Sequence, residues 1–257
     1  MEGHAAEHHG HEWEVSVWPL VLSVGILFLA PFAFAFYFVY DMPMLAVLSF
    51  GLGVILTVLS LGGWVSESIR GRDVYTKEPA YGIAAMPYLI IAEAFIFIAF
   101  ILAYWVTRLL YDGAWPPAGT PHIGMVTPVI MTVILVSSSV TLHLGEERLE
   151  HNDTKGFIQW LIVTMILGAA FLGLSINEWN HLFREGFNFK TNIYSTSFFS
   201  ITGFHGSHVA VGLSAFVCVL LPALRGTVSK TLVKSVSVYW HFVDIVWFFV
   251  VSQVYFW

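Results

Sequence analysis

Ionisable side chains lie inside apolar stretches of this sequence. Glu93 is surrounded by apolar residues, His205 and His208 are three residues apart in a second stretch, and His241 and Asp244 are three residues apart in a third. Acids and imidazoles accept and release protons, and imidazoles also bind haem iron or other metals. Such groups are costly in lipid unless they pair, hydrate or face another helix. These five residues are therefore the first candidates for function.

Glu93 and the His241–Asp244 pair each allow two interpretations. Glu93 lies about 15 Å into its apolar stretch if that stretch is helical, which places it near the middle of a bilayer. It is a proton relay or a site for carboxyl reagents, or else it makes an interhelical hydrogen bond that fixes packing. His241 and Asp244 form a relay or a buried polar contact between helices or subunits.

Metal or haem binding is the other chemistry that the histidines permit. His205 and His208 share one face of a helix, and His143 or His241 would have to complete a ligand set. No motif with known metal-ligand spacing accompanies them, and the neighbouring glycines allow close helix approach. Hydrogen bonds across a helix interface are therefore favoured, and we expect no catalytic residue and no metal ligand in this chain.

The composition is that of a membrane protein. Of the 257 residues, 57% are apolar and 11% are charged, unlike a soluble domain. Each bilayer crossing needs about 20 helical residues, so the chain has room for about seven or eight crossings and no large soluble domain. The single cysteine, Cys218, excludes an internal disulfide and a thiolate cluster. The net charge of −6 includes no basic tract, which argues against nucleic-acid binding.

Apolar segments predict an all-α polytopic membrane protein with seven transmembrane helices in a single domain, 1–257. Inside lipid each backbone amide must bond within its own helix, because no water replaces that bond. Asp41-Met42-Pro43 predicts a tight turn between the first two spans. The segments are 17–40, 44–66, 83–108, 125–145, 157–180, 193–222 and 235–257.

The basic residues predict the orientation. With the N-terminus inside, the inner loops hold eight of the 11 Lys and Arg residues, so the chain is expected to be N-inside and C-outside. Residues 1–16 are rich in His and Glu and lack the features of a signal or transit peptide. They are expected to form a cytoplasmic tail.

Four residues near the predicted membrane edges are candidates for lipid contact. Trp64 and Arg70 lie across the inner end of the second span, and Arg225 lies at the inner end of the sixth. Guanidinium groups at headgroup depth bind lipid phosphates, although simple positive-inside anchoring is an equal alternative. Glu178, at the outer end of the fifth span, reaches headgroups or is a solvated interfacial carboxylate.

A series of motifs in fixed order covers essentially the whole chain. They are Trp18-Pro19, Trp64 with Arg70, Glu93, Trp115-Pro116-Pro117, Glu178-Trp179, Ser197-Phe198-Phe199, Gly203-Phe204-His205-Gly206-Ser207-His208-Val209 and Tyr239-Trp240-His241-Phe242-Val243-Asp244. In order and spacing they resemble subunit III of the haem-copper cytochrome c oxidases, of the bacterial seven-helix type. A single motif would be weak evidence, whereas the series is specific.

The resemblance implies a fold in two arms, spans one and two against spans three to seven, around a V-shaped cleft filled by phospholipids. It implies that Glu93 is the family's carbodiimide-reactive carboxylate and that His205 is its partner. It also implies a non-catalytic core subunit without a redox centre. Haem and copper would reside in partner subunits, with subunit I as the main contact and subunit II in the same complex.

The implied function is that of an accessory subunit of a proton-pumping oxidoreductase. It would bind phospholipids, stabilise subunit I, support proton uptake and guide oxygen, in a bacterial inner membrane and within a respiratory supercomplex. At two places the sequence departs from its relatives, and there the roles of the family's residues cannot be carried over to this chain. Glu146-Glu147 stands where many relatives have two histidines, and Gly71 follows Arg70 where mitochondrial relatives have a Glu.

Other functions compete with this one. The same fold could serve a quinol oxidase or a nitric oxide reductase, which the spectra of the co-purified haems would distinguish. A stand-alone proton-coupled transporter would use Glu93, His205 and Asp244 as its relay. Transporters usually show internal repeats and broken helices, and the sequence contains no detectable repeat.

Overall fold

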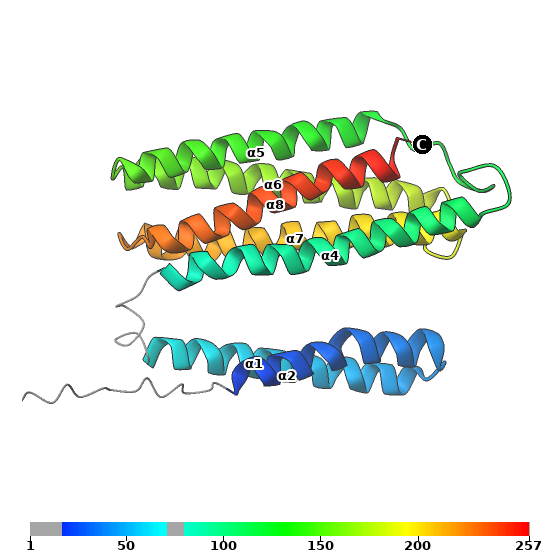
Figure 1. The fold of residues 1–257 in the computed structure, drawn as a ribbon, viewed down its shortest axis with the longest axis horizontal. Coiled ribbons are helices and arrows are strands. Elements are labelled where there is room, and N and C mark those ends of the chain that lie inside the picture. Colours follow the sequence, from blue (N-terminus) through cyan, green and yellow to red (C-terminus); the bar gives the residue numbers. More distant parts are fainter. Residues whose placement is uncertain (1–16, 71–79, 257) are drawn as a thin grey trace, which may run out of the picture. The chain divides into compact units, whose positions relative to one another are not determined.

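The computed structural model describes residues 17–70 and 80–256, and every regular element in these ranges is a helix (Figure 1). This confirms the all-α expectation for that part of the chain. The chain divides into two compact units, Met1–Glu78 and Pro79–Trp257. The boundary falls between the second and third predicted spans.

The first unit is a helical hairpin whose first half is irregular. α1 (Trp18–Leu27) passes into two π-helical turns, η1 (Phe28–Phe32) and η2 (Ala35–Val39), and α2 (Pro43–Arg70) packs against all three. Pro31 lies inside η1 and has no N–H group, so one regular helical hydrogen bond is lost there. The first predicted span, 17–40, is therefore helical but is not one regular α-helix.

α2 packs closely against η1. The Ser49 hydroxyl donates a hydrogen bond to the Phe28 carbonyl oxygen at 2.7 Å, so that this carbonyl has a partner from the next helix. Gly53 lies directly against the backbone of Leu29, and a Cβ atom there would overlap it. The two helices thus approach closely at this point. The predicted tight turn is confirmed, with Asp41 at a φ of 53°.

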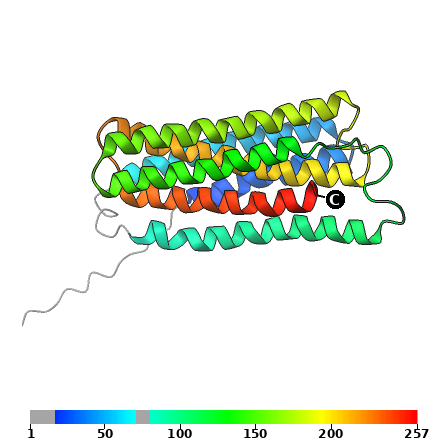
Figure 2. The same ribbon diagram turned by 90° about the horizontal axis from the view of Figure 1, so that it is seen from above.

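The second unit is a bundle of long helices that run along a common direction (Figure 2). Side chains that accept a hydrogen bond from a first-turn N–H group start three of them: Asp153, Asn192 and Ser229. The cap at Ser229 explains why the last helix begins before the predicted residue 235. The helices are α4 (Ala80–Leu110), α5 (Val126–Glu150), α6 (Thr154–Arg184), α7 (Ile193–Leu224) and α8 (Lys230–Val254).

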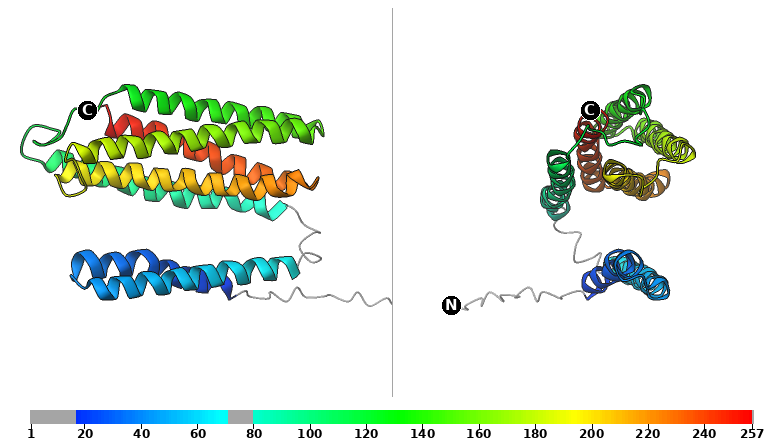
Figure 3. Two further views of the ribbon diagram at one scale, coloured as in Figure 1. Left: turned by 180° about the vertical axis from the view of Figure 1, so that it is seen from behind. Right: turned by 90° about the vertical axis from the view of Figure 1, so that its right-hand side faces the viewer.

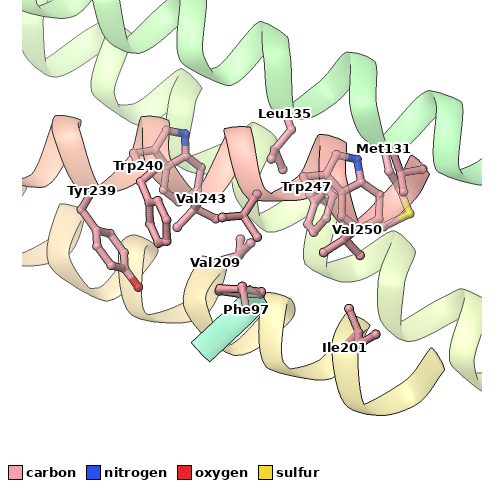
Figure 4. Close-up of a cluster of buried hydrophobic side chains, with 14 of the residues drawn as sticks. Phe97, Met131, Leu135, Ile201, Val209, Tyr239, Trp240, Val243, Trp247 and Val250 are labelled. Carbon is pink, nitrogen blue, oxygen red and sulfur yellow. The ribbon is translucent and has the colours of Figure 1, made fainter. Parts of the chain in front are cut away.

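α8 is the central helix of the second unit. In its most apolar 18-residue window 61% of the residues are buried, against 11–33% in the other long apolar helices. It packs against α4, α5 and α7, and the end-on view shows it between them (Figure 3, right). Its residues Trp240 and Trp247 lie among Leu135 of α5 and Val209 of α7 (Figure 4). The core of this unit is therefore built around the last helix of the chain.

The described residues contain six helices that are long and apolar enough to cross a membrane, namely α2 and α4 to α8. The chain is therefore a multi-pass membrane protein. These helices correspond to the second to seventh predicted spans. α1 is only 10 residues long, so the seventh crossing stays a prediction, as does the N-inside orientation.

Candidate functional site

Glu93 of α4 pairs with His208 of α7. The His208 Nε2 atom lies 3.2 Å from Glu93 Oε2, and the two side chains are only 10% and 25% exposed. The other ring nitrogen of His208, Nδ1, lies 2.8 Å from the carbonyl oxygen of Phe204. A carbonyl accepts but does not donate, so Nδ1 is the donor in this contact and Nε2 is the ring nitrogen that faces the carboxyl group. The His208 ring is thus oriented by the backbone of α7, the helix to which it belongs.

Aromatic rings surround this pair. Phe97 of α4 and Phe204 of α7 present their rings to the His208 imidazole, with centroids 5.0 Å and 4.6 Å away. The Tyr239 hydroxyl of α8 donates to the backbone carbonyl of His208 at 3.3 Å. Water is therefore largely replaced by rings around the imidazole, which strengthens the electrostatic interaction with Glu93.

His205 is not the partner of Glu93, which corrects the expectation from the resemblance. Three residues along a helix turn a side chain by about 60°, and this suffices to aim His205 at a different neighbour. Its ring is fully buried and lies 5.6 Å from the Phe171 ring and 5.1 Å from the Trp247 ring. Neither ring nitrogen has a hydrogen-bond partner among the described residues.

His241 and Asp244 of α8 meet a third residue, Ser139 of α5. The Ser139 Oγ atom lies 2.9 Å from His241 Nδ1 and donates a hydrogen bond to Asp244 Oδ2. Asp244 is only 6% exposed, and its Oδ1 atom has no partner in the described part of the chain. The acid and the imidazole are thus joined through a hydroxyl group.

Trp240 fixes the rotation of α8 at this place. Its fully buried ring is held between Gly168 of α6 and Gly212 of α7, where a Cβ atom on either glycine would lie 2.7 Å from a ring carbon. Its Nε1–H group donates to the Ser138 hydroxyl at 3.0 Å. Trp247, two turns later, donates to a threonine hydroxyl of the same helix α5 at 2.9 Å. These contacts bring His241 and Asp244 to Ser139.

Glu178 of α6 is buried inside the protein, which corrects the expectation that it reaches lipid headgroups or solvent. It is 9% exposed and accepts a hydrogen bond from the Tyr255 hydroxyl at 2.8 Å. Burial raises the pKa of Tyr255, which lies just beyond α8, well above its usual value, and the neighbouring Glu178 acts in the same direction. The phenol therefore keeps its proton and acts as the donor. This carboxyl group ties α6 to the end of α8.

Of the other three candidates for lipid contact, the structure describes the side chain of one. Arg225 is exposed at the C-terminal cap of α7, where its guanidinium is free to meet headgroups. The side chains of Trp64 and Arg70 lie outside the part of the structure that is described.

The histidines do not converge on one point. His205, His208 and His241 face different neighbours, as described above, and His143 is exposed on α5. Within residues 17–70 and 80–256, no three His, Cys, Asp or Glu side chains are arranged so that they could hold a metal ion.

Sequence comparisons place these features in a family. The profile of the family described as cytochrome c oxidase subunit III matches residues 8–257. The chain belongs to this family. Among its relatives, "Cytochrome c oxidase subunit 3" of Synechocystis is 35% identical over 72% of this chain and 82% of the relative. The protein of the same name from Xenopus laevis is 33% identical over 97% of each chain. A "Probable cytochrome c oxidase subunit 3" of Nocardia farcinica is 37% identical over 64% of this chain and 82% of the relative.

Membership in the cytochrome c oxidase subunit III family confirms the resemblance and assigns the chain to a subunit of an oxidoreductase complex. The family match and the long apolar helices agree on a multi-pass membrane protein.

Several residues that build the site of this cytochrome c oxidase subunit III family member escaped the sequence reasoning. Ser139 is one of three consecutive serines and has no distinctive motif. Tyr255 follows the last predicted apolar stretch without a motif of its own. The hydrogen bond from Trp105 to Gln253, 2.8 Å long, joins α4 to α8 without any sequence signal. A signal existed for Tyr255 alone, because a buried acid such as Glu178 requires a donor.

Proposed function

We propose that this chain is a non-catalytic core subunit of an aerobic respiratory terminal oxidase in a bacterial inner membrane. The observation that carries the proposal is the family match over residues 8–257. The internal arrangement supports it, because the acids and imidazoles of the bundle pair with residues of neighbouring helices. In this proposal haem and copper belong to partner subunits I and II, and subunit I makes the main contact.

The proposed role is to stabilise subunit I, to support proton uptake there and to guide oxygen. It includes seven spans in two arms, an N-inside and C-outside orientation, and phospholipids between the arms. Arg225, exposed at the end of α7, is the described residue best placed for a lipid phosphate. Trp64 and Arg70 remain candidates on sequence grounds.

Purification in mild detergent tests the proposal. We expect chains that carry haem and copper to co-purify with this chain, and we expect the isolated polypeptide to carry neither. The spectra of the co-purified haems separate a cytochrome c oxidase from a quinol oxidase or a nitric oxide reductase. Haem bound stoichiometrically to this chain alone would refute the proposal.

The role of Glu93 gives a sharper test. In the proposed role, the Glu93–His208 pair holds α4 against α7 and conducts no pumped protons. Glu93→Gln keeps the size of the side chain and replaces the carboxyl group with an amide, which cannot take up or release a proton near neutral pH. We therefore expect proton pumping to stay largely intact while lipid occupancy or inactivation during turnover changes. Complete loss of pumping in a fully assembled complex would contradict this role.

A further inference from the structure

We propose that Ser139, His241 and Asp244 form a serine-bridged proton-relay site between α5 and α8, which exchanges protons with the end of α5 that carries His143 and Glu146. The site is separate from the Glu93–His208 pair, which joins α4 to α7. The inference does not depend on which complex the chain joins.

The bridging hydroxyl is the first argument. A serine hydroxyl donates one hydrogen bond and also accepts, so it can pass a proton from one neighbour to the other without leaving its place. Ser139 Oγ lies within hydrogen-bond distance of both His241 Nδ1 and Asp244 Oδ2. A serine that served packing alone would bond its own helix, as Ser137 does to the Val133 carbonyl oxygen at 2.7 Å.

The burial of Asp244 is the second argument. Asp244 is 6% exposed, and its Oδ1 atom makes no hydrogen bond to the described residues. An ionised carboxylate with one donor in such surroundings is strongly disfavoured. Sharing a proton with Ser139 and His241 removes that charge. The resting form is therefore the protonated acid beside a neutral imidazole.

The transfer step is balanced and needs no other reactant. When Asp244 is ionised, Ser139 donates to its Oδ2 atom; when Oδ2 carries the proton, the acid donates to Ser139 Oγ and the hydroxyl turns to His241 Nδ1. From this second form the Asp244 carboxyl group gives its proton to Ser139 Oγ, while Ser139 gives its own proton to His241 Nδ1. The products are a carboxylate, an unchanged serine and an imidazolium ion. The imidazolium then releases the proton on its Nε2 atom. Return of a proton to Nε2, followed by the reverse transfer from Nδ1 through Ser139 to Asp244, restores the starting state.

The exit for this proton lies along α5. His143 and Glu146 follow Ser139 by four and seven residues, so the three share one helix face. Both His143 and Glu146 act electrostatically on His241. His143 is exposed and Glu146 is half-exposed, so these two groups are the acceptors on α5 that a proton from His241 would reach outside the core.

The charged groups on the other sides of α8 do not take part. From α4 and α7, Glu93 and His208 approach α8 at Tyr239, whose hydroxyl bonds the His208 carbonyl oxygen. The Glu93 carboxyl group and the His208 imidazole contact each other and not the His241–Asp244 face of α8. The face of α8 that carries His241 and Asp244 is thus served by α5 alone among the described helices.

Infrared spectroscopy of the full-length chain in its purified complex tests the relay. The difference spectrum between wild type and Asp244→Asn isolates the C=O band of a protonated Asp244 carboxyl group, and transfer to D2O reports how fast its proton exchanges. We expect the band in the wild type at neutral pH. We expect Ser139→Ala to slow the exchange by on the order of 100-fold, as for loss of a positioned proton-transfer group.

Two matched variants separate a relay from a packing role. Ser139→Thr keeps a hydroxyl group and should exchange nearly as fast as the wild type. Ser137→Ala, the same substitution two residues away, should leave the exchange unchanged. Absence of the Asp244 band in the wild type, or exchange in Ser139→Ala as fast as in Ser137→Ala, would overturn the proposal. Equal slowing in Ser139→Ala and Ser139→Thr would also overturn it, because the hydroxyl group would then be irrelevant.

Discussion

The second unit contains two acid–imidazole pairs that are built differently. Glu93 and His208 touch directly, with side chains that are 25% and 10% exposed, and they join α4 to α7. Asp244 and His241 both belong to α8, are bridged by Ser139 of α5, and include an almost fully buried acid. A direct contact holds two helices together, whereas a bridged contact also provides a route for a proton. The same residue types therefore serve different purposes according to what lies between them.

The largest effect should come from a change that removes the support of the bridged pair alone. Trp240→Ala empties a fully buried site between Gly168 and Gly212 and deletes the hydrogen bond to Ser138. We expect a loss of about 3–5 kcal/mol of stability, measured by unfolding of this subunit in the purified complex. Reaction of Glu93 with a hydrophobic carbodiimide should persist in folded protein, because the carboxyl group and the imidazole of the direct pair belong to α4 and α7. Equal loss of both pairs would contradict the comparison.

A smaller effect should follow from crowding the same tryptophan. Gly212→Ala would place a Cβ atom 2.7 Å from the Trp240 ring, and Gly168 on the other side prevents the ring from moving away. We expect a cost of about 1–3 kcal/mol. Gly206→Ala on the same helix is the control, since its nearest atom would be 3.9 Å away. Thermal unfolding should show no destabilisation there, and similar midpoints for the two variants would show that Trp240 has room to shift.

The two acids should also differ in their reactivity. Mass spectrometry after treatment with a hydrophobic carbodiimide should find Glu93 modified before Asp244, because the Glu93 side chain is 25% exposed and Asp244 is 6% exposed. If α5 and α8 must separate to admit the reagent, an opening that costs about 1.4 kcal/mol already slows the reaction tenfold. Faster modification of Asp244 would mean that the bridged pair is open to lipid.

The smallest expected effect is the difference in coupling energy. Double-mutant cycles on Ser139→Ala with Asp244→Asn, and on Glu93→Gln with His208→Asn, measure each pair separately. We expect about 1–2 kcal/mol for the bridged pair and about 0.5 kcal/mol for the direct pair, within the range of hydrogen bonds between membrane helices. The direct pair is the weaker one because its carboxyl group is partly exposed. A reversed order would assign the tighter contact to α4 and α7.

Much of this fold followed from the sequence. Apolar length and the requirement for internal backbone hydrogen bonds located α2 and α4 to α8, and the cost of ionisable groups in lipid identified Glu93, His208 and Asp244 as residues with partners. Sequence periodicity does not state which helix faces which, so the choice between His205 and His208 as the partner of Glu93 could not be made. A rotation of about 60° on α7 decides it.

The missed features have physical causes. Ser139 is indistinguishable from its serine neighbours until α8 is placed, because a helical serine usually bonds its own backbone. Glu178 stood near a predicted membrane edge, and only the fold brings Tyr255 to it. The irregular turn at Pro31 was equally hard to locate from the sequence, because prolines are tolerated in membrane helices where neighbouring groups satisfy the freed backbone atoms.

The central position of α8 has a consequence for biogenesis. α8 and Tyr255 are synthesised after α4 to α7, yet Ser138 and Glu178 depend on them for hydrogen-bond donors. Until α8 has been inserted, α4 to α7 stay in the bilayer with these polar groups unsatisfied. A nascent chain that stalls before α8 would leave α4 to α7 without their central helix. We expect membrane quality control to degrade such a chain.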